Sequence, residues 1–343
     1  MDDLTTKRNV TLCIGSHHDP HINAVETKVR HLANDLKFVL FNPLRNDHYI
    51  DISLENNKPY SCVITTGDEQ VSSNRVQSVW YRWKPEKFYD GDSMYDTLTK
   101  DFALEEWKNV ILSLAGFVSE AVWINPLLNI EQIKSKAFQL RLAQECGLKI
   151  PLSKITNDAA SVQSLFSKPT LRIVSKPLTP LLIPPNKRIR PNEISKEYAM
   201  ASSSRISIFP GIFQEMIPNG NNIRVVIVGD VIFSTRSAAT KSDLGKVEQD
   251  SEPTTLPRKP CKVPEVVENG LLSFHRRAGL IYGVYNLVEL DDKLFFLDCD
   301  PCGAWLCLEN GLASAVSEAV AKTLIGAKTK QNEMSCLKQF KNL

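Results

Sequence analysis

The stretch YGVYNLVELDDKLFFLDCD, residues 282–300, holds two apolar runs on either side of the polar turn DDK and ends in an acid-x-acid pattern. The runs Tyr282–Leu290 and Leu294–Asp300 are short, rich in β-branched and aromatic residues, and bounded by turn residues, which predicts a β-hairpin. Side chains alternate along a strand, so one face of the second strand is expected to carry Leu294, Phe296, Asp298 and Asp300.

The two aspartates of this face are the first indication of chemistry. They lie roughly 7 Å apart at ~3.3 Å per residue, close enough to share a hard divalent cation. Asp298 follows a buried run, where an uncompensated carboxylate costs several kcal/mol. The other interpretation is that both side chains cap the following turn. A three-residue turn over 291–293 would place Asn286 directly opposite Asp298, whereas a two-residue turn would break that alignment.

The composition excludes several classes of protein. In 343 residues, 41 Lys plus Arg against 39 Asp plus Glu give a formal net charge of +2, which argues against a nucleic-acid binder or a membrane-surface protein. The apolar runs fall far short of the ~20 residues of a membrane helix, and the polar start MDDLTTKRNV is unlike a signal peptide. Eight scattered cysteines suit reduced thiols. We therefore expect a cytoplasmic protein with neither nucleic acid nor membrane as partner.

Periodicity and turn residues predict an α/β protein in three parts and a tail. The N-terminal α/β domain, 1–125, is expected to contain strands over Val10–Ile14, Lys37–Leu40 and Val79–Trp83 and a helix over Ala103–Glu120. The central part, 126–210, is expected to contain a helix over Glu131–Cys146 stopped by Gly147, a strand over Thr170–Lys176, an exposed loop over 178–190 and a Ser-rich turn over 202–210.

The third part, 211–330, begins with a second hairpin. Gly229-Asp230 separates the β-rich runs Arg224–Gly229 and Val231–Thr235 and is a strong hairpin signal. A loop over 241–260, a helix over Pro264–Ala278 and a closing helix over Leu312–Leu324 are expected around the hairpin of residues 282–300. Residues 331–343 form a polar tail.

Isolated polar residues in apolar surroundings are the remaining candidates, because the sequence has no Walker-type loop, G-x-G-x-x-G or G-x-S-x-G motif. Lys136 lies at the edge of the apolar face of its predicted helix, and Lys176 ends an apolar strand. Either residue is a solvated charge or a ligand-binding residue. Arg224 leads four apolar residues, where an inward guanidinium needs an anionic partner. The segment Gln214–Ile217 is either a strand end or a backbone surface for a planar ring.

Two further clusters contain residue types that could bind a metal. SHHDPH, residues 16–21, offers three His and one Asp after the first strand, but neighbouring His side chains in a loop diverge. Cys299, Cys302 and Cys307 follow the acid-x-acid strand. Cys299 is expected to face away from Asp298 and to belong to the core. A polar loop and a buried thiol are therefore the simpler interpretations, and the basic residues 187–190 are read either as a solvated loop or as a guide for an anionic ligand.

Taken in order along the chain, the two lysines, the Gln-Glu segment, the Arg-led hairpin and the acid-x-acid-Pro strand form one pattern. It runs through VWYRWKP (79–85), INPLLNIEQIKSKAFQLRLAQECGLKIPLSKITND (124–158), FPGIFQEMIPNGNNIRVVIVGDVIF (209–233) and LIYGVYNLVELDDKLFFLDCDPCGAWLCLE (280–309). These segments span most of the chain. They resemble the ATP-grasp superfamily and, more closely, its graspetide (microviridin-type) peptide macrocyclases.

The resemblance implies a fold and a set of roles. It implies the ATP-grasp fold, with central and C-terminal subdomains after the N-terminal domain, and the cofactors ATP and Mg²⁺. Lys136 and Lys176 look like the lysines that pair with phosphates, and Arg224 like the catalytic arginine. The residues that look like the family's adenine-binding segment are Gln214, Glu215, Met216 and Ile217. Asp298 and Asp300 look like the family's magnesium ligands.

The same resemblance implies the reaction. A substrate carboxylate takes the γ-phosphoryl group of ATP, and a hydroxyl or amine then attacks the acyl phosphate, so no protein nucleophile is required. The substrate would be a ribosomal precursor peptide, and a homodimer is a further expectation. The alternatives are a ligase that acts on a protein tail or a small carboxylate, and a catalytically weakened relative that only binds nucleotide or peptide.

The sequence departs from the family pattern at several positions, and two asparagines and a missing arginine among them favour the weakened alternative. Asn286 stands where the family has a metal-binding Asp, and Asn222 stands where an acid is usual. An arginine is missing around Asp243–Lys246, and Ala304 replaces a common Gln. Asp298 is also one methylene shorter than the family's Glu. We therefore expect nucleotide binding to survive and catalysis to be weakened or substrate-specific.

Overall fold

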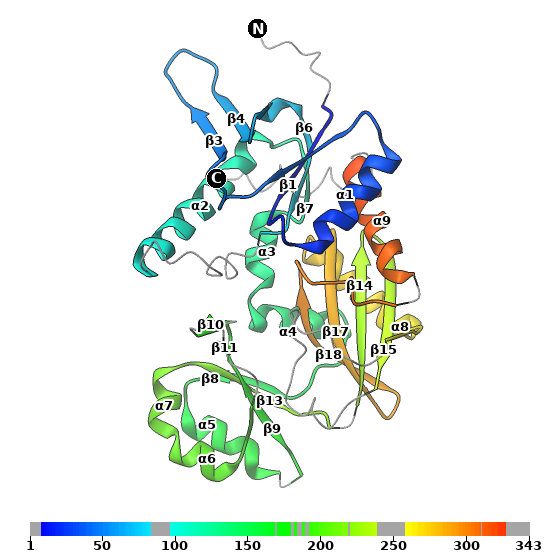
Figure 1. Cartoon of the computed structure of the whole chain (residues 1–343). Helices are drawn as coiled ribbons and strands as arrows, with labels where there is room; N and C mark the ends of the chain where they lie inside the picture. Colours follow the sequence, from blue (N-terminus) through cyan, green and yellow to red (C-terminus); the bar gives the residue numbers. More distant parts are fainter. Residues whose placement is uncertain are drawn as a thin grey trace. The chain divides into compact units, whose positions relative to one another are not determined.

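The computed structural model describes residues 8–83, 97–168, 170–179, 182–183, 187–188, 192–218, 220–238, 258–309 and 311–326. The chain packs into two compact units, which are treated separately (Figure 1). The first unit comprises Met1–Asn129, Gly279–Tyr282 and Ala313–Leu343, and the second comprises Ile130–Ala278 and Gly283–Leu312. The three-part division expected from the sequence stays a prediction.

Unit 1 is built on a four-stranded parallel sheet in the order β2-β1-β6-β7. Every residue of the central strand β1 is buried, as expected for a parallel sheet covered on both faces. Its elements are β1 Val10–Ile14, α1 Pro20–Leu32, β2 Lys37–Phe41, β3 His48–Ser53, β4 Ser61–Thr66, β5 Glu69–Ser72, η1 Ser73–Arg75, β6 Val76–Tyr81, α2 Thr97–Phe117, β7 Val122–Ile124 and α9 Leu312–Ile325.

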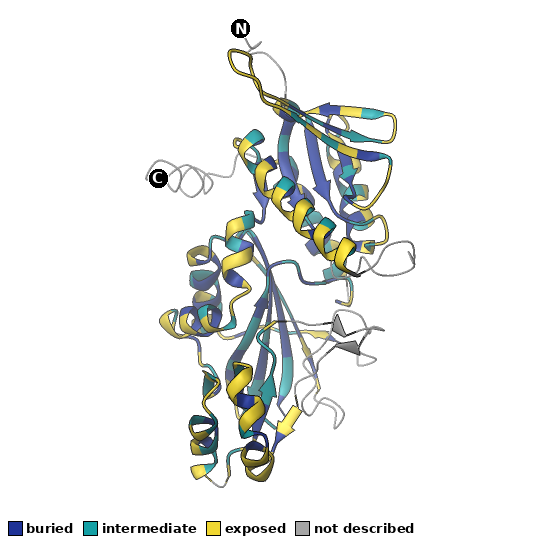
Figure 2. Ribbon diagram, turned by 90° about the vertical axis from the view of Figure 1, so that its left-hand side faces the viewer, coloured by how far each residue is buried: buried dark blue, intermediate teal, exposed yellow. Residues whose placement is uncertain are grey.

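A separate antiparallel sheet, β3-β4-β5, completes unit 1 and was not anticipated. Its inward residues Cys62, Ile64 and Val71 belong to the same hydrophobic core as the parallel sheet and α2. Figure 2 shows the result: the strands of the parallel sheet are buried, whereas the helices present exposed outer faces. Apolar burial of this extent is the main stabilising term of the unit.

Unit 2 contains two larger sheets and a two-stranded ribbon. One sheet has the order β12-β9-β13-β8, the other β16-β15-β14-β17-β18, and the ribbon pairs β10 with β11. Its elements are α3 Leu127–Ile133, which starts in unit 1, α4 Lys136–Glu145, β8 Ser153–Thr156, α5 Ala159–Ser164, η3 Leu165–Ser167, β9 Ile173–Lys176, β10 Leu182–Ile183, β11 Lys187–Arg188, β12 Asn192–Ile194, α6 Lys196–Ala201, α7 Ser203–Ile208, β13 Gly211–Glu215, β14 Asn221–Val228, β15 Val231–Ser237, β16 Lys259–Pro260, α8 Glu265–Arg277, β17 Tyr282–Leu290 and β18 Lys293–Asp300.

Helices cover one face of the five-stranded sheet. The ring of Phe274, in α8, lies 5.2 Å from that of Phe296 in β18 and 5.6 Å from that of Tyr285 in β17. The buried Gln139 side chain of α4 donates to the Cys299 carbonyl and accepts from the Cys299 amide, at 2.8 and 2.9 Å. These contacts fix α4 beside the edge strand β18.

The helix expected over Glu131–Cys146 is two helices. Ser135 is the N-cap of α4, since its hydroxyl accepts from the Phe138 amide, and it separates α4 from α3. A serine placed three residues before a free amide is a strong helix start, and the continuous apolar spacing concealed it. Lys136 therefore lies in the first turn of a helix rather than along its side. Gly147 follows at φ 77°, which confirms the predicted C-terminal stop.

The hairpin of residues 282–300 has a shorter turn than expected, yet it keeps the expected pairing of Asn286 with Asp298. The turn has two residues, since Leu290 pairs with Lys293, so the three-residue turn was wrong. A β-bulge between Asn286 and Leu287 then shifts the register, and Asn286 still pairs with Asp298. The bulge inserts one extra residue into β18, which restores the expected alignment by another route.

The same bulge separates residues that were expected on one face. Leu287 pairs with Phe296, whereas the adjacent Asn286 pairs with Asp298. Adjacent residues of a strand point to opposite faces, so Phe296 and Leu294 face away from Asp298, and the shared face predicted for them was wrong. Asp300 pairs with Val284 and stays on the face of Asp298. Cys299 faces the helices and is 2% exposed, as predicted.

Several smaller expectations have clear outcomes. Residues 202–210 contain the helix α7 rather than a turn, whereas the hairpin around Gly229 and the helix over 264–278 are confirmed. The third strand and the long helix begin earlier than expected, at Val76 and Thr97. The loop expected over 241–260 and the tail 331–343 lie mostly or wholly outside the described residues. No helix of the described part is long and apolar enough to cross a membrane.

The packing of Phe274 predicts a large loss of stability on truncation. Phe274→Ala should lower the free energy of unfolding by about 3–5 kcal/mol, because it leaves a cavity between two buried rings. The measurement is the urea midpoint. Val266→Ala, in the same helix at a side chain 78% exposed, is the matched control and should change it by about 0.5 kcal/mol or less. Equal midpoints for both variants would contradict this account of the core.

Candidate active site

Cationic side chains from three places in unit 2 stabilise the charged carboxylate of Asp298. Lys136 lies at the start of α4, and its Nζ is 3.6 Å from Asp298 Oδ2 in β18. Lys176, at the end of β9, and Arg224, in β14, also act electrostatically on this carboxylate. In the sequence, the outermost two of these four residues, Lys136 and Asp298, lie more than 160 positions apart. The fold brings them together.

Asn286 supplies a further partner for the same group. Its Nδ2 donates to Asp298 Oδ1 at 2.7 Å, so the two oxygens of the carboxylate have different partners. Burial alone would raise the pKa of Asp298. The Lys136 charge, the Asn286 hydrogen bond and the charges of Lys176 and Arg224 outweigh burial and hold this pKa below its usual value. Asp298 therefore stays an anion at neutral pH.

Lys176 is held in a chain of hydrogen bonds. Its Nζ donates to Gln214 Oε1 at 2.7 Å, Gln214 Nε2 donates to Ser153 Oγ at 2.8 Å, and Ser153 donates to the Pro151 carbonyl at 2.8 Å. Burial lowers the pKa of Lys176 to about 8; Lys136 adds to this shift, whereas Asp298 opposes it. The amine remains cationic at neutral pH and titrates in the mildly basic range.

The segment Gln214–Ile217 runs off the end of β13. Gln214 is 2% exposed and its side chain faces Lys176, not an open surface. The amides of Glu215 and Met216 donate to the carbonyls of Leu152 and Arg172, each at 2.8 Å. Within the described residues no hydrogen bond occupies the amide of Ile217, which is half-buried beyond the strand. Within the part of the chain that the structure describes, the Ile217 amide is therefore available as a donor.

Arg224 lies inside the five-stranded sheet. The residue is 6% exposed and pairs across the strands with Thr235. Strand alternation puts it on the face opposite Ile223, and its charge is felt by Asp298. The Asp298 carboxylate is thus one anion whose charge interacts with this inward arginine.

Asp300 stands next to Asp298 on the same face of β18. Its Oδ1 accepts from the Cys302 amide at 2.8 Å, so the turn-capping interpretation is correct for part of this side chain. Two carboxylates and the Asn286 amide make a set of hard oxygen donors. Magnesium is commonly bound by one or two carboxylates with waters and substrate phosphates, so these residues fit Mg²⁺ together with a phosphate ligand.

A metal bound by protein side chains alone is not supported. No group of three or more His, Cys, Asp and Glu residues suited to a metal occurs in the described part of the chain. In the SHHDPH loop, Asp19 accepts from His21 and forms an ion pair with Arg82 at 2.8 Å. In this loop the Asp19 carboxylate thus bonds within the protein, and the polar-loop interpretation of residues 16–21 stays a prediction. The basic residues 187–190 lie outside the described side chains.

Two participants were not identified as such from the sequence. The sequence predicts the place of Asn286 opposite Asp298 and its departure from the family pattern, but not its hydrogen bond to that carboxylate. Ser153 was not singled out, because a serine at the start of a short strand carries no sequence signal. Its partner Gln214 was assigned to a ligand, whereas its side chain bonds within the protein.

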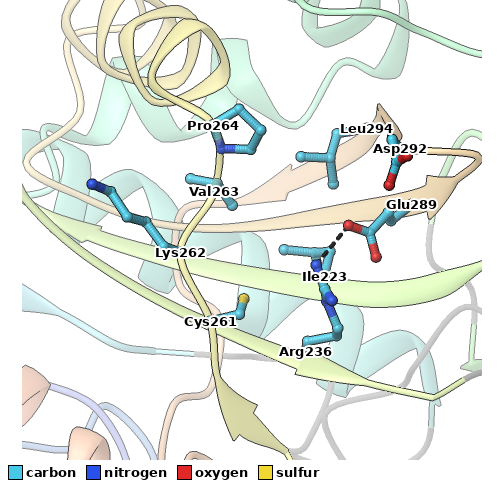
Figure 3. Close-up of a pocket in the computed structure, with 9 residues that line it drawn as sticks. All are labelled: Ile223, Arg236, Cys261, Lys262, Val263, Pro264, Glu289, Asp292 and Leu294. Carbon is cyan, nitrogen blue, oxygen red and sulfur yellow. Dashed lines mark hydrogen bonds and ion pairs between the residues drawn. The ribbon is translucent and has the colours of Figure 1, made fainter.

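A small pocket lies away from these residues, at the other face of the five-stranded sheet. Its volume is about 130 Å³, and an ion pair of 2.6 Å between Arg236 and Glu289 crosses it (Figure 3). Ile223 and Leu294 line it, and the register puts both on the face opposite Arg224 and Asp298. None of the predicted site residues lines this pocket.

No family model matches this chain. A tetrahydromethanopterin:alpha-L-glutamate ligase of Methanococcus maripaludis is 25% identical over 116 residues. That match covers 33% of this chain and only 37% of the relative's length.

Solved structures match over nearly the full length. The macrocyclase MdnC of Microcystis aeruginosa MRC, bound with precursor peptide MdnA, has a TM-score of 0.79 at 23% identity and covers 92% of this chain and 99% of its own. A RiPP-associated ATP-grasp ligase of Chryseobacterium gregarium, in complex with ADP and a leader and core peptide, has 0.80 at 18%, covering 95% and 99%. The ATP-grasp ligase PsnB, complexed with a phosphomimetic precursor variant, Mg and ADP, has 0.69 at 18%, covering 93% and 98%. The fold expected from the sequence is thereby confirmed: this chain has the ATP-grasp fold.

Proposed function

We propose that the chain is an ATP-dependent carboxylate ligase that activates Asp or Glu side chains of a ribosomal precursor peptide and joins them to hydroxyl or amine groups. One observation carries this proposal: in unit 2, Lys136 forms an ion pair with the Asp298 carboxylate, and the charges of Lys176 and Arg224 also stabilise that carboxylate. Cations clustered around a metal-competent carboxylate suit a polyphosphate with its counter-ion, since both charges are then matched.

The nucleotide would use the residues that the sequence singled out. Lys136 and Lys176 would pair with phosphate oxygens, and Asp298 and Asp300 would hold Mg²⁺, which neutralises charge on the phosphates. The adenine would lie along Glu215, Met216 and Ile217, where the Ile217 amide is the donor left by the protein's own hydrogen bonds. Gln214 would contribute through Lys176 rather than by touching the base.

Arg224 would act in the transfer itself. A substrate carboxylate oxygen bonds to the γ-phosphorus of ATP as the bond to ADP breaks, which forms an acyl phosphate. A hydroxyl or amine then attacks the acyl carbon, loses its proton, and releases phosphate. Negative charge builds up on the phosphoryl oxygens in the first step, and a buried guanidinium nearby stabilises it. No protein nucleophile takes part, in agreement with the absence of such a motif.

A peptide substrate is supported by the solved relatives. MdnC and PsnB were crystallised with precursor peptides, and a third relative with a leader and core peptide. A small-carboxylate or protein-tail ligase is the second candidate, favoured by the partial match to a glutamate ligase. Cytoplasmic location, expected from the composition, and a homodimer, implied only by the family resemblance, stay part of this proposal.

The deciding experiment traps the acyl phosphate. The protein is incubated with Mg-ATP, hydroxylamine and short peptides rich in Asp, Glu, Ser, Thr and Lys, including any encoded beside its gene. ADP release with hydroxamate on an acidic side chain supports the peptide ligase. Hydroxamate only on free glutamate or another small acid would favour the second candidate. ATP binding without any hydroxamate would leave a nucleotide-binding relative and overturn the ligase.

Arg224→Gln should separate transfer from binding. The loss of its charge should cut hydroxamate formation by about 10²–10³-fold, because a fixed donor to the developing charge is gone. The Kd for ATP should change by about tenfold at most. Arg236→Gln, a matched change in β15 at a side chain 47% exposed, should leave both unchanged. Wild-type rates in Arg224→Gln would remove this residue from the mechanism.

Asp298→Asn should remove most of the increase in ATP affinity that magnesium gives. In the wild type, Mg²⁺ should tighten ATP binding by about tenfold or more, and the variant should lose most of that gain. Metal-free ATP should bind the variant as well or better, since three cations lose their shared anion. Calorimetry with and without EDTA measures both. Asp292→Asn, in the turn of the same hairpin, is the control; a normal magnesium effect in Asp298→Asn would contradict the assignment.

The pKa of Lys176 predicts a basic limit for nucleotide affinity. Because this pKa is lowered to about 8, the ligand-free protein loses the cation above that pH, whereas bound phosphate favours the charged form. Affinity for ATP should therefore fall by about tenfold per pH unit above pH 8. Lys176→Arg, which stays charged, should bind more weakly but without this dependence. A flat profile in the wild type would exclude Lys176 from phosphate binding.

A further inference from the structure

The chain of hydrogen bonds behind Lys176 has a fixed direction. The Ser153 hydroxyl gives its only proton to the Pro151 carbonyl, so its oxygen is left to accept the Gln214 amide NH₂. That contact turns the amide oxygen of Gln214 toward Lys176, which donates to it at 2.7 Å. An amide has one accepting and one donating end. If it turned over, its NH₂ group would meet an ammonium, and both would lack an acceptor.

The positions of these residues make the chain rigid. Ser153 and Gln214 are paired directly across β8 and β13, and Lys176 lies on β9, the other neighbour of β13. Gln214 is 2% exposed. A buried amide that is satisfied at both ends has no alternative partner in water. The backbones of Ser153, Gln214 and Lys176 are thus held by strand pairing, and their side chains are held by the hydrogen bonds of the chain.

From this geometry we infer that Ser153 is a positioning residue for phosphate binding, acting through Gln214 on the amine of Lys176. Ser153 itself touches neither the nucleotide nor Lys176. It sets the orientation of the Gln214 amide, and the amide oxygen holds the amine in place before a ligand arrives. Preorganisation of this kind lowers the entropy that binding must lose. The inference rests on the proposed function for its ligand, a nucleoside triphosphate, but not for the coupling itself.

The test is a double-mutant cycle between Ser153→Ala and Lys176→Met, read by calorimetry with Mg-ATP. Ser153→Ala should weaken binding by about 3–10-fold in the wild-type background and by less than about 1.5-fold when Lys176 is already absent. Ser153→Thr, which keeps the hydroxyl, should restore most of the affinity. Ser164→Ala is the matched control, because its hydroxyl accepts from a different lysine, Lys154, at 3.1 Å. That variant should bind ATP normally.

A second measurement of the double-mutant cycle uses the stability of the ligand-free protein. The same cycle, measured on urea midpoints, should show that the two substitutions are non-additive, because both act on the orientation of one amide. Losses of equal size in both backgrounds, in affinity and in midpoint alike, would overturn the inference and leave Ser153 with a packing role only. If wild-type protein binds no nucleotide, the proposed function fails while the midpoint cycle still decides the coupling.

Discussion

The Asp298 carboxylate forms an ion pair with Lys136 and interacts electrostatically with Lys176 and Arg224, so it offsets the repulsion among three like charges. Lys136, Lys176 and Arg224 come from a helix start, a strand end and a strand interior, and each is kept out of bulk water to a different degree. Like charges at short range in a poorly hydrated site are costly unless an anion lies between them. One oxygen of Asp298 faces Lys136 and the other accepts from Asn286, so the carboxylate cannot turn freely. The polyphosphate site proposed for this chain depends on that arrangement.

Asn286 orients the Asp298 carboxylate through a hydrogen bond. The related pattern implied a Glu at position 298 and an Asp at position 286. Here the negative charge is carried by Asp298 and Asp300, and the amide of Asn286 donates to the shorter side chain instead of repelling it. Two carboxylates at positions 286 and 298 would lie at hydrogen-bond distance with no proton between them. The exchange of Asp for Asn therefore removes a repulsion and orients Asp298 at the same time.

The two faces of the five-stranded sheet have different tasks. On one face, Phe274, Tyr285 and Phe296 pack into a core that also holds α4 through Gln139. On the other face stand Arg224, Asn286, Asp298 and Asp300. Since α4 is tied to β18, Lys136 at its first turn is carried to the edge of the polar face. Packing on the apolar face of the sheet thus fixes the position of the Lys136 charge at the polar face. The stability of unit 2 is therefore linked to the geometry of its site.

Local physical rules determined much of this protein from the sequence alone. Apolar runs between turn residues located β1, the hairpin at Gly229 and the strand Tyr282–Leu290, because such signals act over a few residues. Spacing also placed Asp298 and Asp300 on one face. Only the tertiary structure decided the rest. The bulge in β18 arises from pairing with β17, so strand period alone put Phe296 on the wrong face. Ser153, Gln214 and Lys176 are joined across three strands, and no local signal could show that Gln214 serves a lysine. The reason is that long-range pairing and the need to satisfy buried polar groups act between residues far apart in the chain.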